Sequence, residues 1–158
     1  MSNSGRCQSS RSEAHDLLSV QNREIIQVGG RGDCLFKCFS QALMGSQRYH
    51  LTYREQIVEF MRERAVSFAV YVDGDYNEHV ESMSKQGTWG TDAEIMAAAT
   101  YFGLPIHVFY RAGQKWEWHT HEPRFSFQFP MDVPVDSIEL VNYDRQHYDL
   151  VHVIQRVP

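Results

Sequence analysis

The sequence predicts a single-domain α+β protein in which helices pack against a sheet. Helical periodicity runs from Cys34 as far as Gly103, whereas the later segments are rich in β-branched and aromatic residues and are separated by turn-forming residues. Helices first and strands later are typical of α+β proteins, because an α/β sheet needs the two to alternate. The length of 158 residues is also that of one domain.

The N-terminal segment differs in composition from the rest of the chain. Five of the first twelve residues are serine, and apolar residues are sparse there. We therefore expect residues 1–20 to be a flexible tail and residues 21–158 to form the domain. The domain begins with a short strand at 23–28, which ends at the glycine-rich stretch that follows it.

The first two helices are predicted from their apolar faces and their end signals. One begins at Cys34, carries apolar residues at three- and four-residue steps, and ends at Gly45. For the next helix, Thr52 and Glu55 have the spacing of a capping box, in which each side chain bonds the other residue's backbone amide. Its apolar face continues to Phe68, so we expect the helix to reach that residue.

A shorter helix and a second capped helix follow. A turn at Asp73–Asp75 precedes the shorter one. Thr91 and Glu94 form another capping-box pattern, ahead of an apolar run that ends at Gly103. The strands expected after that point are 104–110, 114–121, 137–143 and 148–154.

Charge and composition narrow the class of protein. The formal net charge is −5, which gives no basic surface for nucleic acid. No apolar run approaches the ~20 residues of a membrane helix, so we expect no membrane partner. An odd set of three cysteines, and a start without the apolar core of a signal peptide, suit a reducing compartment. The expected location is cytoplasmic, with the nucleus left open.

Cys34 stands where a glycine-rich turn becomes a helix. The free amides at a helix start favour a thiolate, and Gly32 lets the backbone come close enough to donate to an oxyanion. Asp33 opposes a thiolate unless its side chain turns away, so a positive group is expected nearby. From local features alone, Cys34 is either a nucleophile or a small buried residue.

Cys38 is predicted to be a core residue, because it shares a helix face with Leu35 and Ala42. A zinc site built on Cys34 and Cys38 would need two further ligands. The histidines available for such a site, which form no zinc-binding pattern, are His50, His119 and His121. We expect no metal and no other cofactor.

The best partner for a nucleophilic cysteine is His147, which follows a polar turn at the start of the last strand. Asp149 lies two residues further on the same face, within reach of the ring. A carboxylate there would fix the tautomer and favour the imidazolium, as the third member of a catalytic triad does. As an isolated pair, however, His-x-Asp is more often plain strand surface.

Three stretches taken together resemble the ovarian tumour (OTU) family of cysteine deubiquitinases. They are GDCLF at a helix start, TWGTDAEIMAAATYFGLPIHVF in mid-chain and HYDLV near the end, in the order and spacing of that family. The resemblance covers residues 23–155. It implies a papain-like fold with a small, mostly antiparallel sheet, and a monomeric thiol hydrolase without a cofactor. The implied substrate is ubiquitin, a polyubiquitin chain or a ubiquitin-like modifier, cut at the isopeptide bond after its C-terminal Gly-Gly.

The motifs also imply a role for individual residues. Cys34 corresponds to the nucleophile, His147 to the general base and then acid, and Asp149 to the residue that orients His147. Backbone amides around Gly32, Asp33 and Cys34 would form the oxyanion hole. The residues that the resemblance places at a substrate channel are Trp89, Gly90 and Tyr148. Trp89 is also expected to have a mainly structural role, before the helix that follows Gly90.

One departure from the family pattern leaves catalytic competence open. The family's Cys box usually begins with an acidic residue, and this chain has Arg31 there. An Arg cannot accept the backbone hydrogen bonds that an Asp would, although its charge can favour a thiolate. The alternative interpretation is a catalytically weak or inactive ubiquitin-binding module. A general cysteine protease or acyltransferase with an unrelated substrate is a third.

Overall fold

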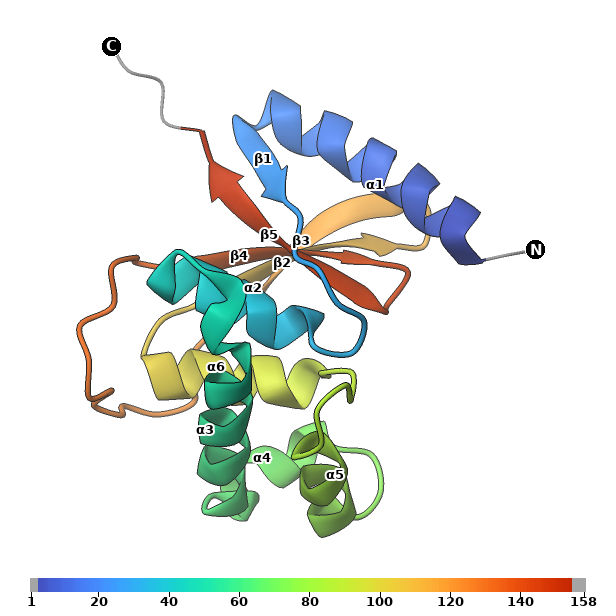
Figure 1. Cartoon of the computed structure of the whole chain (residues 1–158). Helices are drawn as coiled ribbons and strands as arrows, with labels where there is room; N and C mark the ends of the chain where they lie inside the picture. The colour runs from blue at the N-terminus through green and yellow to red at the C-terminus, as the bar shows by residue number, and fades with distance from the viewer. Residues whose placement is uncertain (1–2, 155–158) are drawn as a thin grey trace.

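A five-stranded sheet forms the centre of the molecule in the computed structural model, which describes residues 3–154, with side chains from Ser9 onward (Figure 1). The strand order is β1-β5-β4-β2-β3, and only the β2–β4 pair is parallel. The α+β class with a mostly antiparallel sheet is therefore confirmed. The strands are β1 Arg23–Ile26, β2 Ile106–Ala112, β3 Lys115–His121, β4 Ile138–Tyr143 and β5 His147–Val153.

Helices cover both faces of this sheet. In Figure 1, α1 lies across one face, whereas α2 and α6 lie on the other, with α3, α4 and α5 beyond them. The α-helices are α1 Asn3–Val20, α2 Cys34–Met44, α3 His50–Arg62, α4 Ala65–Phe68, α5 Tyr76–Met83 and α6 Asp92–Phe102. Two 3-10 turns complete the set, η1 Gln47–Tyr49 and η2 Ala69–Tyr71.

The helix ends confirm most of the sequence signals. Gly45 ends α2 and Gly103 ends α6, both with φ of 70°, a left-handed conformation that glycine adopts without strain. Thr91 and Glu94 form both hydrogen bonds of the predicted capping box. Asp75 caps α5 by accepting a hydrogen bond from the Glu78 amide at 2.9 Å.

The predicted start of the second helix is wrong. Thr52 lies inside α3, which begins at His50, and the helix ends at Arg62 instead of reaching Phe68. The helical run in fact begins at η1, directly before α3, where the Ser46 hydroxyl accepts a hydrogen bond from the Arg48 amide at 3.1 Å. The Ser40 hydroxyl on α2 also accepts a hydrogen bond from the Tyr49 amide at 3.1 Å, so the amides at this start are satisfied before Thr52 is reached.

The predicted N-terminal tail also needs correction, because α1 occupies most of it and packs on the sheet. Ala14 and Leu18 are fully buried, one helical turn apart. They join a second, smaller core whose other buried members are Phe109, Val141, Tyr143 and Val151. The serine-rich composition hid this short apolar stripe. Cys7 falls in α1, but its side chain lies outside the described residues.

No helix within residues 3–154 combines the length and the apolar character needed to cross a bilayer.

Candidate active site

Cys34 is the first residue of α2 and is 1% exposed. The backbone amide of Tyr148, on β5, donates to its sulfur at 3.4 Å. The fold therefore joins the Cys34 segment to the last strand, which are far apart in the sequence. The hypothesis that Cys34 is a nucleophile with His147 as its base requires these two segments to lie side by side.

His147 and Asp149 form a hydrogen-bonded pair on β5. The ring Nε2 of His147 lies 2.8 Å from Asp149 Oδ1, and Asp149 is fully buried. The Val28 amide donates to the same carboxylate oxygen at 3.0 Å. The predicted pairing along one strand face is present, and the segment after β1 holds the carboxylate in place.

The surroundings of His147 favour its protonated form. Burial acts to lower the pKa of His147, but hydrogen bonds to Asp149 and Cys34, together with their charges, raise it to about 9. The Tyr143 ring stacks on the imidazole, with centroids 6.0 Å apart and an angle of 10° between the planes. Nε2 faces Asp149, so the other ring nitrogen, Nδ1, is the one available to exchange a proton with Cys34.

A tight turn between β4 and β5 sets the position of His147. Tyr143 pairs with His147 across the hairpin, and the Gln146 amide donates to the Tyr143 carbonyl at 3.0 Å. Asp144 and Arg145 have φ of 52° and 62°. Left-handed residues at both central positions match the right-handed twist of a hairpin, although neither is the usual glycine. The polar turn expected before His147 is confirmed.

The loop before Cys34 is packed against the segment 87–88. A side chain at Gly32 would run into the carbonyl of Gly87, so only glycine fits there. Asp33 Oδ1 accepts hydrogen bonds from the Gly87 amide and from Arg54, both at 2.9 Å. Burial acts to raise the pKa of Asp33, but these two bonds and the charge of Arg54 hold it below its usual value. The Asp33 carboxylate is thus engaged away from the thiol, as the sequence analysis required.

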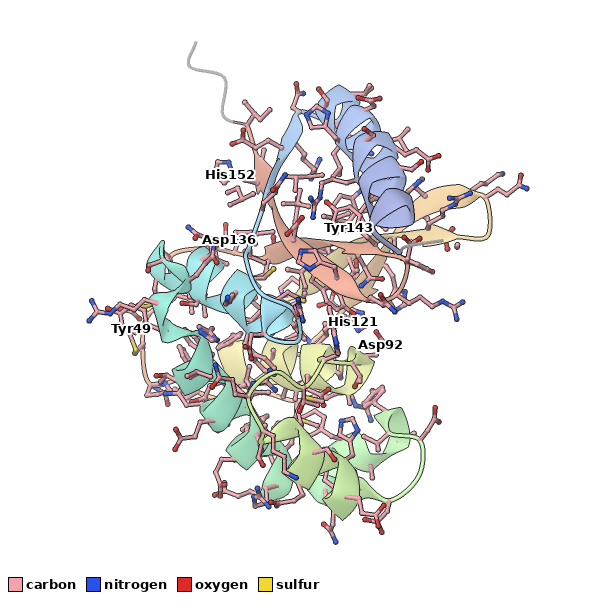
Figure 2. All side chains as sticks on the ribbon, turned by 45° about the vertical axis from the view of Figure 1, so that its right-hand side comes forward. Tyr49, Asp92, His121, Asp136, Tyr143 and His152 are labelled. Atoms are coloured by element: carbon pink, nitrogen blue, oxygen red, sulfur yellow. The ribbon has the colours of Figure 1, made fainter. Side chains whose placement is uncertain are left out.

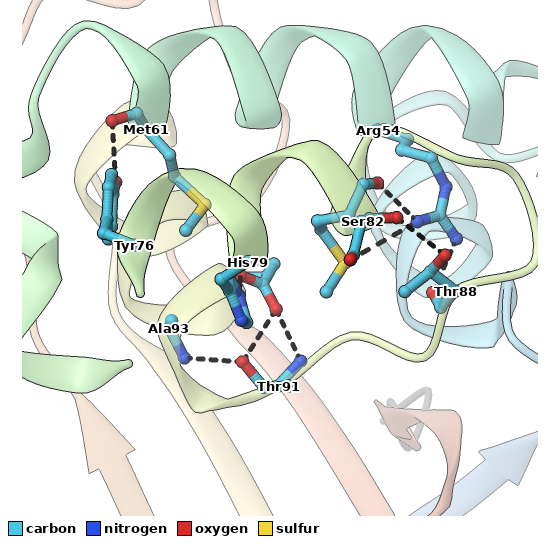
Figure 3. Close-up of polar contacts among 10 residues, drawn as sticks. Arg54, Met61, Tyr76, His79, Ser82, Thr88, Thr91 and Ala93 are labelled. Carbon is cyan, nitrogen blue, oxygen red and sulfur yellow. Dashed lines mark hydrogen bonds and ion pairs between the residues drawn. The ribbon is translucent and has the colours of Figure 1, made fainter. Parts of the chain in front are cut away.

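Arg54, on α3, holds this loop in place and is the residue that sequence reasoning missed. Its guanidinium donates to the carbonyls of Gly32, Met83 and Thr88 at 2.9–3.1 Å, in addition to Asp33. Figure 3 shows Arg54 reaching from α3 toward Thr88. The side chain is almost fully buried, and burial lowers its pKa. Arg54 ties the loop of Cys34 to α3 and to the end of α5, and no local signal marks it.

Arg31, the departure from the family pattern, is exposed. Its carbonyl accepts a long turn hydrogen bond from the Cys34 amide at 3.4 Å. That amide is one of those expected to face an oxyanion.

A cleft of about 500 Å³ opens beside Tyr148 and Gly90, two of the three residues expected at a substrate channel. Gly90 packs so closely on Leu35 that a side chain would meet it. Figure 2 shows Asp92 and His121 close together, and both line the cleft. Trp89 is 42% exposed and is not one of the lining residues, which are Gly90, Thr91, Asp92, Val108, Tyr110, His119, His121, Asn142, Arg145 and Tyr148.

Cys38 and the histidines do not form a metal site within the described residues, where no three His, Cys, Asp or Glu side chains are grouped to hold an ion. Cys38 is fully buried in the core, as predicted, and burial raises the pKa of its thiol well above the usual value.

Comparison with known proteins places this geometry in a family. A family model described as OTU-like cysteine protease matches residues 29–148, which include Cys34 and His147 and end one residue before Asp149. OTU domain-containing protein 1 from Mus musculus is 28% identical over 134 residues, 85% of this chain and 29% of that protein. The chain thus spans under a third of the length of this curated relative.

Solved structures show the same fold. The OTU domain of OTUD1 superposes with a TM-score of 0.78 at 22% identity, covering 96% of this chain and 99% of that one. An OTU deubiquitinase from Wolbachia pipientis wMel bound to ubiquitin gives a TM-score of 0.65 at 16% identity, covering 85% and 98%. Because the family model matches well over half of the chain and includes Cys34 and His147, the chain belongs to the OTU-like cysteine proteases.

Proposed function

We propose that this domain is a thiol-dependent deubiquitinase that hydrolyses isopeptide bonds at the C-terminal Gly-Gly of ubiquitin or a ubiquitin-like modifier. The observation that carries the proposal is the linked set of Cys34, His147 and Asp149, in which His147 contacts both of the other side chains. Family membership supports the reaction class, and the Wolbachia relative with bound ubiquitin supports the substrate class.

In the proposed reaction, Cys34 and His147 stand as a thiolate and an imidazolium, and the thiolate sulfur attacks the isopeptide carbonyl. The resulting tetrahedral oxyanion is held by backbone amides of the loop at Gly32–Cys34. His147 then gives its proton to the departing lysine amine, leaving an acyl-enzyme on Cys34. Water, deprotonated by His147, attacks the thioester, and the modifier's carboxylate and the free thiol are regenerated.

The cleft beside Gly90 and Tyr148 is the proposed path for the Gly-Gly end of the substrate. Gly90, which has no side chain, lines this cleft together with Tyr148, whose amide lies at the Cys34 sulfur, so the cleft offers a passage beside the nucleophile. A glycine-glycine segment fits such a passage because it carries no side chains. The monomeric state and the cytoplasmic location remain predictions.

A ubiquitin probe with a C-terminal electrophile tests the proposal. The wild-type domain should be labelled covalently, and Cys34→Ala should abolish labelling, because the bond forms at that sulfur. Cys38→Ala is the matched control, since it removes a buried thiol from the next turn of the same helix and should leave labelling intact. Wild-type protein that binds ubiquitin without being labelled would instead support the inactive binding module, the alternative that the long Cys34 amide bond to Arg31 keeps open.

A further inference from the structure

The N-terminal helix reaches the back of the candidate triad through Arg11. Its guanidinium Nη2 lies 3.4 Å from Asp149 Oδ2. The other carboxylate oxygen, Oδ1, is occupied by His147 and by the Val28 amide. Asp149 is therefore held from two sides, with the imidazole on one oxygen and Arg11 on the other.

The same guanidinium also lies over the ring that supports His147. The central carbon of Arg11 is 5.2 Å from the centre of the Tyr143 ring, and that ring stacks on the imidazole. Figure 2 shows Tyr143 directly beneath α1. Arg11 thus contacts both residues that fix the orientation of His147, although it contacts neither Cys34 nor the cleft.

Burial makes this ion pair matter. Asp149 is fully buried, and within the described residues Arg11 is the positively charged group that faces its Oδ2, beside the Tyr143 side chain, which interacts with both. Without Arg11, His147 would still face Oδ1, but the charge on Oδ2 would lose its counterpart. A buried carboxylate relieves such a cost by turning toward water or by binding a proton. Either change would remove Oδ1 from its place against the imidazole.

We propose that Arg11 is a positioning residue for catalysis, acting through Asp149 to hold His147 in line with Cys34. The inference rests on the proposed function and extends it to a helix that lies outside the residues matched by the family model. Arg11 neutralises the second oxygen of the carboxylate, so that the first stays on the imidazole. The positive charge is the property that this role requires. Arg11→Lys keeps that charge and should therefore retain most of the activity.

A double-mutant cycle between Arg11 and Asp149 tests this. The substrate is a fluorogenic C-terminal ubiquitin derivative. Arg11→Gln should lower kcat by about 10-fold and change KM little. This is the lower end of the loss found when a residue that supports a functional histidine from behind is removed. Asp149→Asn should lower the rate by about 10²- to 10⁴-fold. In the Asp149→Asn background, Arg11→Gln should cost almost nothing further, because the charge through which Arg11 acts has gone.

A second readout does not depend on ubiquitin. The rate of Cys34 alkylation by iodoacetamide, followed by peptide mass to separate it from Cys7 and Cys38, should fall on Arg11→Gln only while Asp149 is present. If this coupling appears in a protein that does not hydrolyse ubiquitin, the inference stands and the proposed function fails. If ubiquitin is hydrolysed and the coupling is absent, the proposed function stands and the inference about Arg11 fails.

Glu13→Gln is the matched control, because it removes a charge from the same helix. The Glu13 carboxylate accepts a hydrogen bond from the Trp116 ring nitrogen at 3.0 Å and does not contact the triad. It should leave kcat and the alkylation rate unchanged. An equal loss from Arg11→Gln in both backgrounds, or a loss that Arg11→Lys shares in full, would mean that Arg11 only supports the fold and would overturn the proposal.

Discussion

His147 depends on its neighbours more than any other residue of the candidate site. An isolated histidine has a pKa of about 6.5 and is mostly neutral at neutral pH. Here hydrogen bonds to Asp149 and Cys34 outweigh burial and raise the pKa of His147 to about 9. The imidazole is consequently protonated at neutral pH, which is the form that pairs with a thiolate and later protonates a leaving amine.

This pKa predicts the alkaline limit of activity. Because the protonated ring is the active form, kcat/KM should be retained at neutral pH and should fall as the pH rises through about 9. Asp149→Asn removes a group that raises the pKa, so the alkaline limit should move to lower pH. Rates measured with the fluorogenic ubiquitin derivative between neutral pH and the alkaline limit would show both effects.

His152→Gln is the control for that profile. His152 is an exposed histidine on the same strand that pairs with Glu24 at 3.3 Å, away from the thiol. Its replacement should leave the alkaline limit unchanged. An alkaline limit that persists unaltered in Asp149→Asn would show that another group sets it.

The three residues of the proposed triad could be named from the sequence, whereas Arg11 and Arg54 could not. Cys34 follows a glycine-rich turn, and the spacing of His147 and Asp149 fits one strand face. Each of these signals is local. The two arginines sit on helices among other polar residues, and only the folded chain brings them to Asp149 and Asp33.

At the level of elements, the contact between α3 and the Cys34 loop gives the site its shape. A single guanidinium donates to three carbonyls and one carboxylate, in the Cys34 loop, at the last residue of α5 and at Thr88. Arginine suits this task because its planar fork offers five donors, whereas the ammonium of lysine offers three around one point.

Arg54→Lys should therefore be far from conservative. It should lower the free energy of unfolding by about 2 kcal/mol, the cost of leaving a buried polar group unsatisfied, and should reduce probe labelling because the loop is released. Urea denaturation and labelling kinetics measure the two effects. Arg62→Lys, on an exposed part of the same helix, is the matched control and should change neither. Equal stability of the two variants would show that the guanidinium network contributes little.

Element boundaries were predictable where the end signal is local, and failed where it is tertiary. The capping box at Thr91 and the glycine ends of α2 and α6 behave as their sequence indicates. The box at Thr52 does not form, because the helical run starts earlier, with Ser46 as its cap and Ser40 of another helix bonded to the Tyr49 amide. A motif of two residues cannot show that a competing partner exists elsewhere.

At the level of the whole molecule, α1 closes the face of the sheet opposite α2 and α6 (Figure 1). Among the side chains described for this helix, from Ser9 onward, the apolar ones that are fully buried against the sheet are Ala14 and Leu18. The hidden face of the sheet would otherwise expose Phe109, Val141 and Tyr143. The helix thus serves both the stability of the sheet and, through Arg11, the proposed chemistry.

The contribution of α1 to stability can be measured with two neighbouring leucines. Leu18→Ala should lower the free energy of unfolding by about 2–5 kcal/mol, the range for a leucine lost from a packed core. Leu17→Ala changes a side chain that is 43% exposed and should cost less than about 0.5 kcal/mol. Urea denaturation of the two variants gives the comparison, and equal stabilities would restore the flexible tail that the composition suggested.

The sequence by itself determined the α+β class, most helix ends and the late strands, and its family motifs named one cysteine and one histidine as candidate partners. These features depend on periodicity, caps and short motifs, which act over a few residues. Only the tertiary structure decided that the serine-rich start is a packed helix and that Arg11 and Arg54 serve the site. The physical reason is that buried charges are stabilised by whichever partner the fold brings within a few ångströms, and that distance is not encoded in any single stretch of the chain.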